Sequence, residues 1–232
     1  MSEPPSGTVP SSVPASQFAA QLRETPLYAI VDTTLRPELS VIVIAEMLLR
    51  GGARIIQYRH KGKFGRGNFE ECCGLARRIH EAGGLFVVND RADVAELCGA
   101  DGVHLGHEDL PPDKARSVIS SGKIMGYSTH NLEQAKLAGA LPVDYIALGP
   151  IFTTQTKQNP DPVVGLSLVS AARRLISRPL IAIGGITLER AASLLRTGAD
   201  GVAIASDLLK HPDIEMRTRE SLAVLREACN ER

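Results

Sequence analysis

The sequence lacks several features that mark other classes of protein. It has no tryptophan, only 4% aromatic residues, and equal numbers of acidic and basic residues, 26 of each. A net charge of zero argues against a broad basic surface for nucleic acid or an anionic membrane. None of its apolar runs reaches the roughly 18 residues that a membrane-spanning helix needs. We therefore expect neither nucleic acid nor a membrane among its partners.

Cysteine is scarce, and its spacing fits neither a zinc site nor a secreted disulfide framework. The residues concerned are Cys72, Cys73, Cys98 and Cys229. We interpret them as reduced thiols and expect a cytoplasmic protein. Residues 1–17 are rich in proline and serine and lack the basic-then-apolar order of a signal peptide. They are predicted to be a flexible tail, and residues 18–232 one catalytic domain.

Short aliphatic runs recur along the chain and alternate with helical patterns. The chain has 232 residues, of which 44% are hydrophobic, so it can bury a sizeable core. Its length suits one eight-stranded α/β barrel, and the alternation predicts a single (β/α)8 TIM barrel. The predicted strands are 28–31, 54–59, 85–89, 102–105, 123–127, 144–148, 179–183 and 201–204. The predicted helices include 37–50, 68–82, 166–177 and 187–196.

Most of these runs end in glycine, charged or hydroxyl residues, which is the layout of a barrel active site. Arg59 and Lys61 follow the second run and share one face, because side chains alternate along a strand. Gln57 continues that face inward. Two cations at a barrel mouth suit an anionic ligand, and Arg can bind phosphate in a bidentate manner. A solvated loop charge is the alternative interpretation.

Carboxylates follow the third and fourth runs. Asn89 and Asp90 end the third run, and Asp109 comes shortly after the fourth. Neighbouring strands lie about 4.8 Å apart, so the two carboxylates can meet. Beside the two cations they predict Mg²⁺ shared with a substrate diphosphate, since magnesium usually takes one or two carboxylates plus phosphate oxygens. Asp90 as a helix N-cap and Asp109 as an ordinary loop charge are the alternatives.

Ser128 ends the fifth run and is followed closely by His130. We reject a hydrolase, because near neighbours rarely give a productive nucleophile–base geometry and no nucleophile elbow is present. Ser128 is interpreted as a hydrogen-bond donor to an anion. His104 and His107 are not expected to bind metal, since one lies in a strand and the other in a loop.

A second anion site is predicted after the last three runs. The long loop 149–164 carries Thr154, Gln155, Thr156 and Lys157, which can donate several hydrogen bonds to phosphate. Gly184–Gly185 and Ala205–Ser206 then offer backbone N–H groups to an anion. The near copies 99–103 and 198–202 are interpreted as helix-stop turns, with Asp101 and Asp200 at the wrong end for chemistry. One mouth is thus predicted to hold two anionic ligands.

Together these motifs resemble the thiamine-phosphate synthase family over about residues 27–208. The motifs are 57–61, 89–90, 104–106 with Asp109, 126–128, 149–152 with 154–157, and 184–186. The family joins 4-amino-2-methyl-5-(diphosphomethyl)pyrimidine to 4-methyl-5-(2-phosphoethyl)thiazole, or its carboxylated form, giving thiamine phosphate and pyrophosphate. The resemblance implies a transferase that acts on two small phosphorylated substrates by a Mg²⁺-assisted dissociative displacement. Whether it forms a homodimer is left open.

The resemblance also implies a role for each matching residue. The catalytic residues would be Arg59, Lys61, Ser128 and Lys157. The pyrimidine diphosphate would be bound by Gln57, Arg59, Lys61, Asn89, Ser128 and Lys157. The thiazole phosphate would be bound by Thr154, Gln155, Thr156, Gly185, Ala205 and Ser206. Mg²⁺ would be held by Asp90 and Asp109.

The chain departs from the family pattern at Thr153, Ala205 and Asp207. Asp207 places an acid near the expected thiazole phosphate, so either that phosphate binds less well or the side chain points away. Two alternatives stay open. A thiazole tautomerase-like paralogue would need His130 as a proton shuttle and would have no use for the diphosphate cluster. A non-catalytic phospho-ligand-binding barrel would bind the ligands without forming product.

Overall fold

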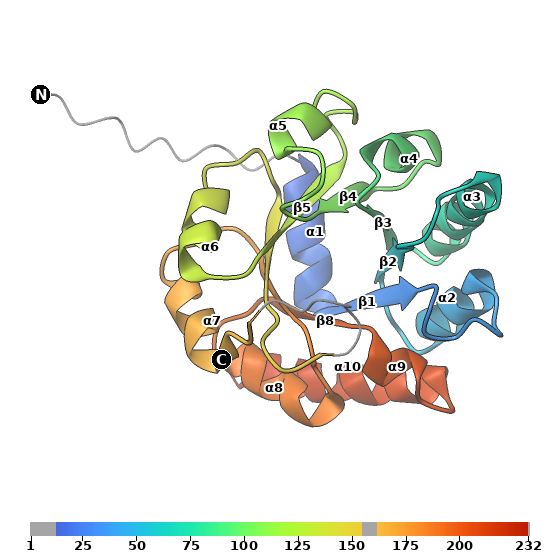
Figure 1. Cartoon of the computed structure of the whole chain (residues 1–232). Coiled ribbons are helices and arrows are strands. Elements are labelled where there is room, and N and C mark those ends of the chain that lie inside the picture. Colours follow the sequence, from blue (N-terminus) through green and yellow to red (C-terminus); the bar gives the residue numbers. More distant parts are fainter. Residues whose placement is uncertain (1–12, 155–161, 232) are drawn as a thin grey trace, which may run out of the picture.

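The computed structural model describes residues 13–154 and 162–231, and its eight parallel strands form a closed barrel (Figure 1). Each strand pairs with its neighbours in sequence, and β1 closes the ring against β8. This confirms the predicted (β/α)8 barrel. The strands are β1 (Leu27–Asp32), β2 (Ile55–Arg59), β3 (Leu85–Asn89), β4 (Gly102–Leu105), β5 (Ile124–Thr129), β6 (Tyr145–Leu148), β7 (Leu180–Ile183) and β8 (Gly201–Ile204).

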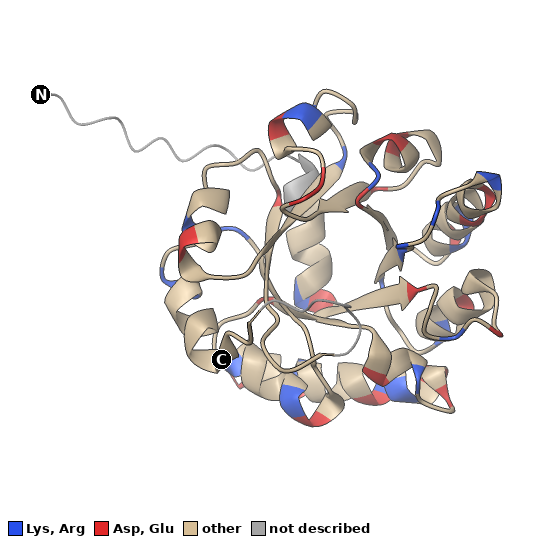
Figure 2. Ribbon diagram, in the orientation of Figure 1, with Lys and Arg blue, Asp and Glu red and all other residues tan. Residues whose placement is uncertain are grey.

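Helices surround the barrel and connect successive strands. They are α2 (Val41–Arg50), α3 (Arg66–Glu81), α4 (Ala92–Leu97), α5 (Pro112–Ala115), α6 (Leu132–Ala138), α7 (Gly165–Arg173), α8 (Leu188–Arg196), α9 (Ser206–Leu209) and α10 (Ile214–Asn230). The helical sequence expected after the last strand is therefore two helices, α9 and α10. Acidic and basic residues are interspersed over these outer helices (Figure 2). No helix in the described ranges is long and apolar enough to cross a membrane.

The strands are apolar on both faces, which explains why they read as continuous hydrophobic runs. One core cluster joins the outward side chains, such as Ile56 and Val88, to the helices. A second, smaller cluster fills the barrel interior with side chains such as Ile55 and Val87, one residue out of step with the first. Alternation along each strand thus builds both cores at once.

An additional helix, α1 (Val13–Glu24), closes the N-terminal end of the barrel. Figure 1 shows it across the centre of the ring of strands. Its buried side chains Phe18 and Leu22 belong to the interior core. Residues 1–17 were predicted to form a flexible tail, so this helix, which begins at Val13, was not expected. Residues 1–12 lie outside the described chain, so the prediction for them stays a prediction.

The repeated turns before β4 and β8 have a structural role. Asp101 accepts a hydrogen bond from the backbone N–H of Phe86 at 2.7 Å, and Asp200 accepts one from Leu180 at 2.7 Å. The preceding Gly99 and Gly198 have φ of 78° and 115°, a region that glycine enters without strain. Each aspartate therefore ties the start of its strand to the neighbouring strand, at the end of the barrel opposite the predicted site.

Candidate active site

The first strand contributes a residue that the sequence analysis missed. Asp32 ends β1, is 1% exposed, and forms an ion pair with Arg59, its register partner at the end of β2. Asp32 also accepts hydrogen bonds from the N–H and hydroxyl of Thr34 at 3.0 and 2.6 Å. This network fixes the predicted diphosphate-binding arginine in the mouth. The signal was present in the sequence, because Asp32 follows an apolar run as the other site residues do.

Lys61 and Asp90 meet across the ends of β2 and β3. The Lys61 Nζ lies 2.6 Å from the Asp90 Oδ2. Asp90 has φ of 66°, a left-handed conformation that Asp and Asn adopt more readily than other non-glycine residues. The N-cap of α4 is Arg91 and not Asp90, so the N-cap alternative for Asp90 is wrong.

Asp109 brings a second carboxylate to this point. Its Oδ2 accepts a hydrogen bond from the N–H of Gly106 at 2.6 Å. Burial, with a smaller contribution from its contact with Asp90, raises the pKa of Asp109 to about 6. Two carboxylates this close repel each other when both are ionised, and a cation between them would relieve that repulsion. The side chains of Asp90 and Asp109 therefore lie together, as the sequence predicted.

The oxygen donors of this pair suit a hard cation such as Mg²⁺. In the described part of the chain, no group of three or more His, Cys, Asp or Glu side chains could hold a metal ion. A Zn²⁺ or Ca²⁺ site built from protein alone needs more ligands than Asp90 and Asp109 supply. Mg²⁺ keeps several waters and shares phosphate oxygens with its substrate, so two carboxylates are enough.

Asn89 presents a buried polar atom toward the same region. Its Nδ2 is buried and has no hydrogen-bond partner among the described residues. A buried amide group without a partner costs roughly 1–3 kcal/mol, so such groups usually have a ligand or water in the working protein. The orphaned donor agrees with the prediction that Asn89 binds substrate.

A chain of buried hydrogen bonds runs beneath the mouth, inside the barrel. The Gln57 Nε2 donates to the Tyr28 hydroxyl at 2.9 Å, and that hydroxyl lies 2.9 Å from the Tyr145 hydroxyl. Tyr145 bonds to the Nδ1 of His104 at 2.9 Å, and the His104 Nε2 bonds to the Ser128 Oγ at 2.8 Å. Burial lowers the pKa of His104 to about 4. Sequence reasoning placed Gln57 and Ser128 in the site but missed both tyrosines.

Ser128 is paired with His104, and its neighbour His130 faces another group. The His130 Nδ1 lies 2.6 Å from the carbonyl oxygen of Gly149, at the end of β6. Ser128 and His130 therefore do not form a nucleophile–base pair in the described structure, as the sequence analysis argued. A proton-shuttle role for His130 would also have to break its contact with that carbonyl.

The loops after β6 and β7 are joined through their backbones. Ile151 donates to the carbonyl of Ile183 at 2.9 Å, and Phe152 donates to that of Gly184 at 3.1 Å. Gly185 has φ of 63°, and a Cβ there would lie 2.3 Å from the carbonyl oxygen of Thr153. Only glycine permits this approach, which explains the glycine pair predicted to face a phosphate.

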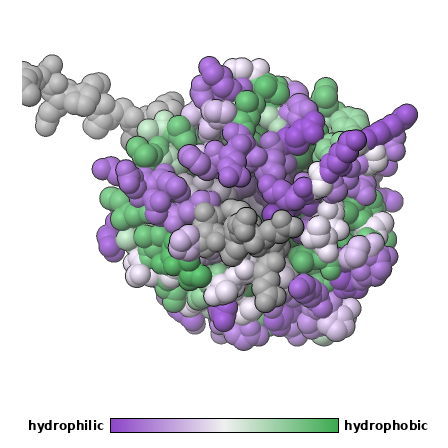
Figure 3. All heavy atoms as spheres, in the orientation of Figure 1, coloured by the Kyte–Doolittle hydropathy of each residue, from purple (hydrophilic) through white to green (hydrophobic). Residues whose placement is uncertain are grey.

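A pocket of about 280 Å³ lies where these loops meet the end of β8. Three residues predicted to bind the thiazole phosphate line it, namely Thr154, Gly185 and Ser206. The lining also includes two cations that sequence reasoning missed, Arg190 and Lys210. Hydroxyls, a backbone approach and cations together suit a small anion. Hydrophilic residues are gathered around the middle of the face shown in Figure 3.

Arg190 supports the floor of this pocket. Its guanidinium lies 4.7 Å from the ring centroid of Phe152 and donates to the carbonyl of Gly185 at 3.0 Å. Ala205, which directly follows β8, instead packs against the interior core. Its small side chain is a packing feature, and only its neighbour Ser206 lines the pocket.

Asp207, the acid that departs from the family pattern, is paired with an arginine. Both Asp207 oxygens accept hydrogen bonds from Arg217, each at 2.9 Å, and this contact raises the pKa of Arg217. The Asp207 side chain is only 13% exposed. A bidentate pair of this kind leaves no uncompensated negative charge beside a bound phosphate. Asp207 lines the pocket, so its side chain does not point away, and its charge is compensated by Arg217.

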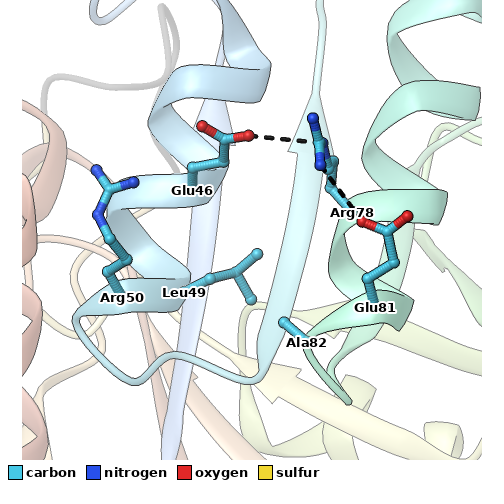
Figure 4. Close-up of a pocket in the computed structure, with 6 residues that line it drawn as sticks. All are labelled: Glu46, Leu49, Arg50, Arg78, Glu81 and Ala82. Carbon is cyan, nitrogen blue, oxygen red and sulfur yellow. Dashed lines mark hydrogen bonds and ion pairs between the residues drawn. The ribbon is translucent and has the colours of Figure 1, made fainter.

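Three predicted residues, Gln155, Thr156 and Lys157, lie outside the described part of the chain, and their roles stay predictions. A second pocket, of about 250 Å³, lies between α2 and α3 at the opposite end of the barrel (Figure 4). Its Arg78 is paired with Glu46 at 3.5 Å and Glu81 at 3.4 Å. We assign no function to this pocket, because its charges compensate one another.

Comparison with known proteins points to one family. The model of the family described as thiamine monophosphate synthase matches residues 27–208. The thiamine-phosphate synthase of Koribacter versatilis is 44% identical over 215 residues, covering 90% of this chain and 99% of that protein. That of Lawsonia intracellularis is 41% identical over 194 residues, covering 84% and 89%. The structure of thiamine phosphate pyrophosphorylase from Pyrococcus furiosus superposes with a TM-score of 0.81 at 33% identity, covering 90% and 98%.

Proposed function

The chain belongs to the thiamine monophosphate synthase family, and on this premise we propose that its barrel mouth joins a pyrimidine diphosphate to a thiazole phosphate. The products are thiamine phosphate and pyrophosphate, and the enzyme is a transferase. The observation that carries the proposal is one mouth with two separate anion-binding halves. A charged half lies at the ends of β1 to β5, and a hydroxyl-lined pocket lies between the ends of β6 to β8.

In the proposed reaction, the bond between the pyrimidinylmethyl carbon and the diphosphate oxygen breaks, and its electron pair leaves with pyrophosphate. The thiazole nitrogen then forms the new C–N bond with its own lone pair, so no general base is required. The aminopyrimidine can delocalise positive charge, which favours a dissociative path. The protein's main task is to stabilise the negative charge that develops on the leaving group.

The charged half supplies that stabilisation. Arg59 and Lys61 are held at the mouth by Asp32 and Asp90. Lys157, from the long loop 149–164, is proposed to join them. Ser128 is proposed to donate its hydroxyl to the diphosphate. Gln57 and Asn89 complete this half, and the orphaned Nδ2 of Asn89 supports its assignment.

Mg²⁺ is proposed as the cofactor, held by Asp90 and Asp109. The fit rests on two carboxylates in contact, because a cation between them would relieve their mutual repulsion. When bound, the metal would neutralise charge on the leaving pyrophosphate. Lys61 stays near this point through its 2.6 Å contact with Asp90.

The half with the hydroxyl-lined pocket, called the pocket half below, is proposed to hold the thiazole by its phosphate. Thr154, Gly185 and Ser206 line the pocket, and Gln155 and Thr156 are proposed to join them. Ala205 is retained as a proposed backbone contact directly before Ser206. Holding the phosphate fixes the thiazole nitrogen relative to the reacting carbon, which can lower a bimolecular barrier by several kcal/mol.

Two further proposals concern the setting of the enzyme. Four free cysteines support a reducing, cytoplasmic location. A homodimer is the other proposal, and sedimentation equilibrium would decide it. Neither affects the chemistry proposed for the mouth.

The test is a coupled product assay. The protein is incubated with both substrates and Mg²⁺, and thiamine phosphate and pyrophosphate are quantified, with each substrate omitted in turn and with EDTA as controls. We expect the two products in equal amounts, and only in the complete mixture. Isomerisation of the thiazole without the pyrimidine would indicate the tautomerase alternative, and binding of both ligands without product would indicate a non-catalytic barrel.

A further inference from the structure

The hydrogen-bonded chain inside the barrel has a direction. The Gln57 Nε2 is a donor, so the Tyr28 oxygen accepts from it at 2.9 Å. Because this oxygen already accepts from Gln57, we assign the single Tyr28 hydroxyl proton to the contact with the Tyr145 oxygen 2.9 Å away. Tyr145 in turn gives its single proton to the Nδ1 of His104, also at 2.9 Å. Each hydroxyl thus accepts once and donates once.

This direction fixes the tautomer of His104. The side chain is buried, with the residue 6% exposed in the barrel interior, where a charged ring would be costly. A neutral imidazole carries one N–H, and because Nδ1 accepts, the proton lies on Nε2. The Nε2–H then donates to the Ser128 Oγ at 2.8 Å. The Ser128 proton remains for another acceptor, and Ser128 stands at the mouth.

We propose that Tyr145 is a positioning residue that, through His104, fixes the Ser128 hydroxyl as a donor to the substrate diphosphate. This inference rests on the proposed function, because that function supplies the diphosphate that accepts the Ser128 proton. Without the Tyr145 hydroxyl, His104 is free to carry its proton on Nδ1. The Ser128 proton would then be donated to the bare Nε2, and the diphosphate would lose one hydrogen bond.

The position of Tyr145 is determined by packing as well as by hydrogen bonds. Its ring stacks on Phe18 of α1, with centroids 4.4 Å apart and planes at 20°. The His104 ring lies 5.5 Å from it at 27°. At Gly126 a Cβ would come within 2.0 Å of the Tyr145 ring, so glycine there makes room for it. A change limited to the hydroxyl therefore leaves the ring in place.

The kinetic test compares two tyrosine-to-phenylalanine variants. Tyr145→Phe removes the hydroxyl that bonds to His104. Tyr58→Phe removes another buried hydroxyl, bonded to Glu71 and Asn68 on the outer side of the barrel. A hydrogen bond to a charged group is worth roughly 1.5–3 kcal/mol, so Tyr145→Phe should lower turnover about 10- to 100-fold. The KM for the thiazole phosphate should not change, and Tyr58→Phe should stay within about twofold of the parent.

The same change made in Ser128→Ala protein gives a second readout. If Tyr145 acts through Ser128, adding Tyr145→Phe there should cost less than about twofold, because the hydroxyl that it orients is already gone. An equal loss in both backgrounds, or an equal loss in Tyr145→Phe and Tyr58→Phe, would overturn the inference.

The tautomer can be measured without any substrate. In ¹⁵N-histidine-labelled parent protein, we expect the His104 Nε2 to be protonated and Nδ1 to be bare, and Tyr145→Phe to shift this distribution. A proton on Nδ1 in the parent protein would overturn the inference even if Tyr145→Phe failed to fold. If the parent formed no thiamine phosphate, the proposed function would be wrong. The spectrum would still show the His104 tautomer, and with it the orientation of the Ser128 hydroxyl.

Discussion

The two halves of the barrel mouth solve the problem of anion binding in different ways. At the ends of β1 to β5, charges are paired across strands, as in Arg59 with Asp32 and Lys61 with Asp90. At the ends of β6 to β8, the pocket rests on close backbone packing at Gly185 and on hydroxyls such as Ser206. One half consists of ion pairs, and the other depends largely on close backbone packing around a pocket.

The difference matches the charge that each half must handle. A diphosphate that leaves as pyrophosphate gains negative charge, and cations already held in place stabilise that charge without reorganising. A monophosphate that serves only as an anchor gains no charge during the reaction, so backbone and hydroxyl donors with the nearby Arg190 and Lys210 can hold it. We therefore expect changes in the charged half to affect turnover and changes in the pocket half to affect thiazole affinity.

The largest effect is expected from Asp90→Asn. Asparagine tolerates the left-handed φ of 66°, so the fold should persist while the metal-binding charge is lost. Loss of several kcal/mol of electrostatic stabilisation corresponds to a decrease in turnover of about 100- to 1,000-fold. Turnover is measured with both substrates saturating. Asp93→Asn is the matched control, because Asp93 pairs with Arg91 beside the site. More than a tenth of parental turnover in Asp90→Asn would contradict the metal assignment.

A substitution in the pocket half, Gly185→Ala, should act on thiazole binding. Its Cβ would lie 2.3 Å from the Thr153 carbonyl oxygen, which would displace the pocket wall. Gly83→Ala is the control, since Gly83 has a similar φ of 69° but open space around the new Cβ. Both share a backbone cost of roughly 1–2 kcal/mol, and only Gly185→Ala adds the clash.

We expect Gly185→Ala to raise the KM for thiazole phosphate about 10- to 100-fold, equivalent to roughly 1.4–2.7 kcal/mol, with the KM for the pyrimidine unchanged. Steady-state kinetics with each substrate varied would measure this. If Gly83→Ala gave the same increase, backbone strain rather than pocket geometry would be responsible.

Asp109→Asn should separate stability from activity. The pKa of Asp109 in the folded protein is about 6, above its ordinary value of 3.8. The folded state therefore binds this proton more tightly than the unfolded state, and parental stability falls as pH rises from about 4 to 6. Above that range a neutral asparagine should stabilise the metal-free protein by about 1 kcal/mol, after discounting for solvent screening at this half-buried group.

Thermal unfolding in EDTA would measure this effect at pH 7.5 and pH 4. The gain in Tm for Asp109→Asn should be present at the higher pH and vanish at the lower one, while Mg²⁺ should stabilise only the parent. A variant less stable than the parent at pH 7.5 would show that the carboxylate is a structural group.

The smallest effect is expected from Ser206→Ala. One neutral hydroxyl donor is worth roughly 0.5–1.5 kcal/mol, so the KM for thiazole phosphate should rise about three- to tenfold with turnover nearly unchanged. Initial rates with the thiazole varied would test it. A fall in turnover without a change in that KM would place Ser206 in the chemistry and weaken the division between the halves.

Sequence patterns predicted those parts of the molecule that depend on local order. All eight strands, and polar residues such as Lys61, Asp90 and Ser128 at their ends, could be found because apolar runs and their endings are contiguous in the chain. The helix α1 was missed because its first residues are rich in proline and serine, and its stability depends on burying Phe18 in the barrel.

Interactions across strands could not be predicted in the same way. Asp32 was overlooked as a partner of Arg59 because the pairing depends on register. The Tyr28–Tyr145–His104 chain joins residues from three strands, each of which alone resembles ordinary core. Asp207 shows the same limit, since its charge was visible in the sequence while its pairing with Arg217, ten residues away on another helix, was not.

Simultaneous binding is the most direct test of the two-half site. Calorimetric titration of thiazole phosphate would be carried out on protein already saturated with Mg²⁺ and pyrophosphate. We predict one thiazole phosphate bound per chain, with an affinity that saturating pyrophosphate does not abolish. Gly185→Ala should weaken this affinity about 10- to 100-fold, and Asp90→Asn should leave it unchanged. Competition between the two anions for one position would contradict the division of the mouth into two halves.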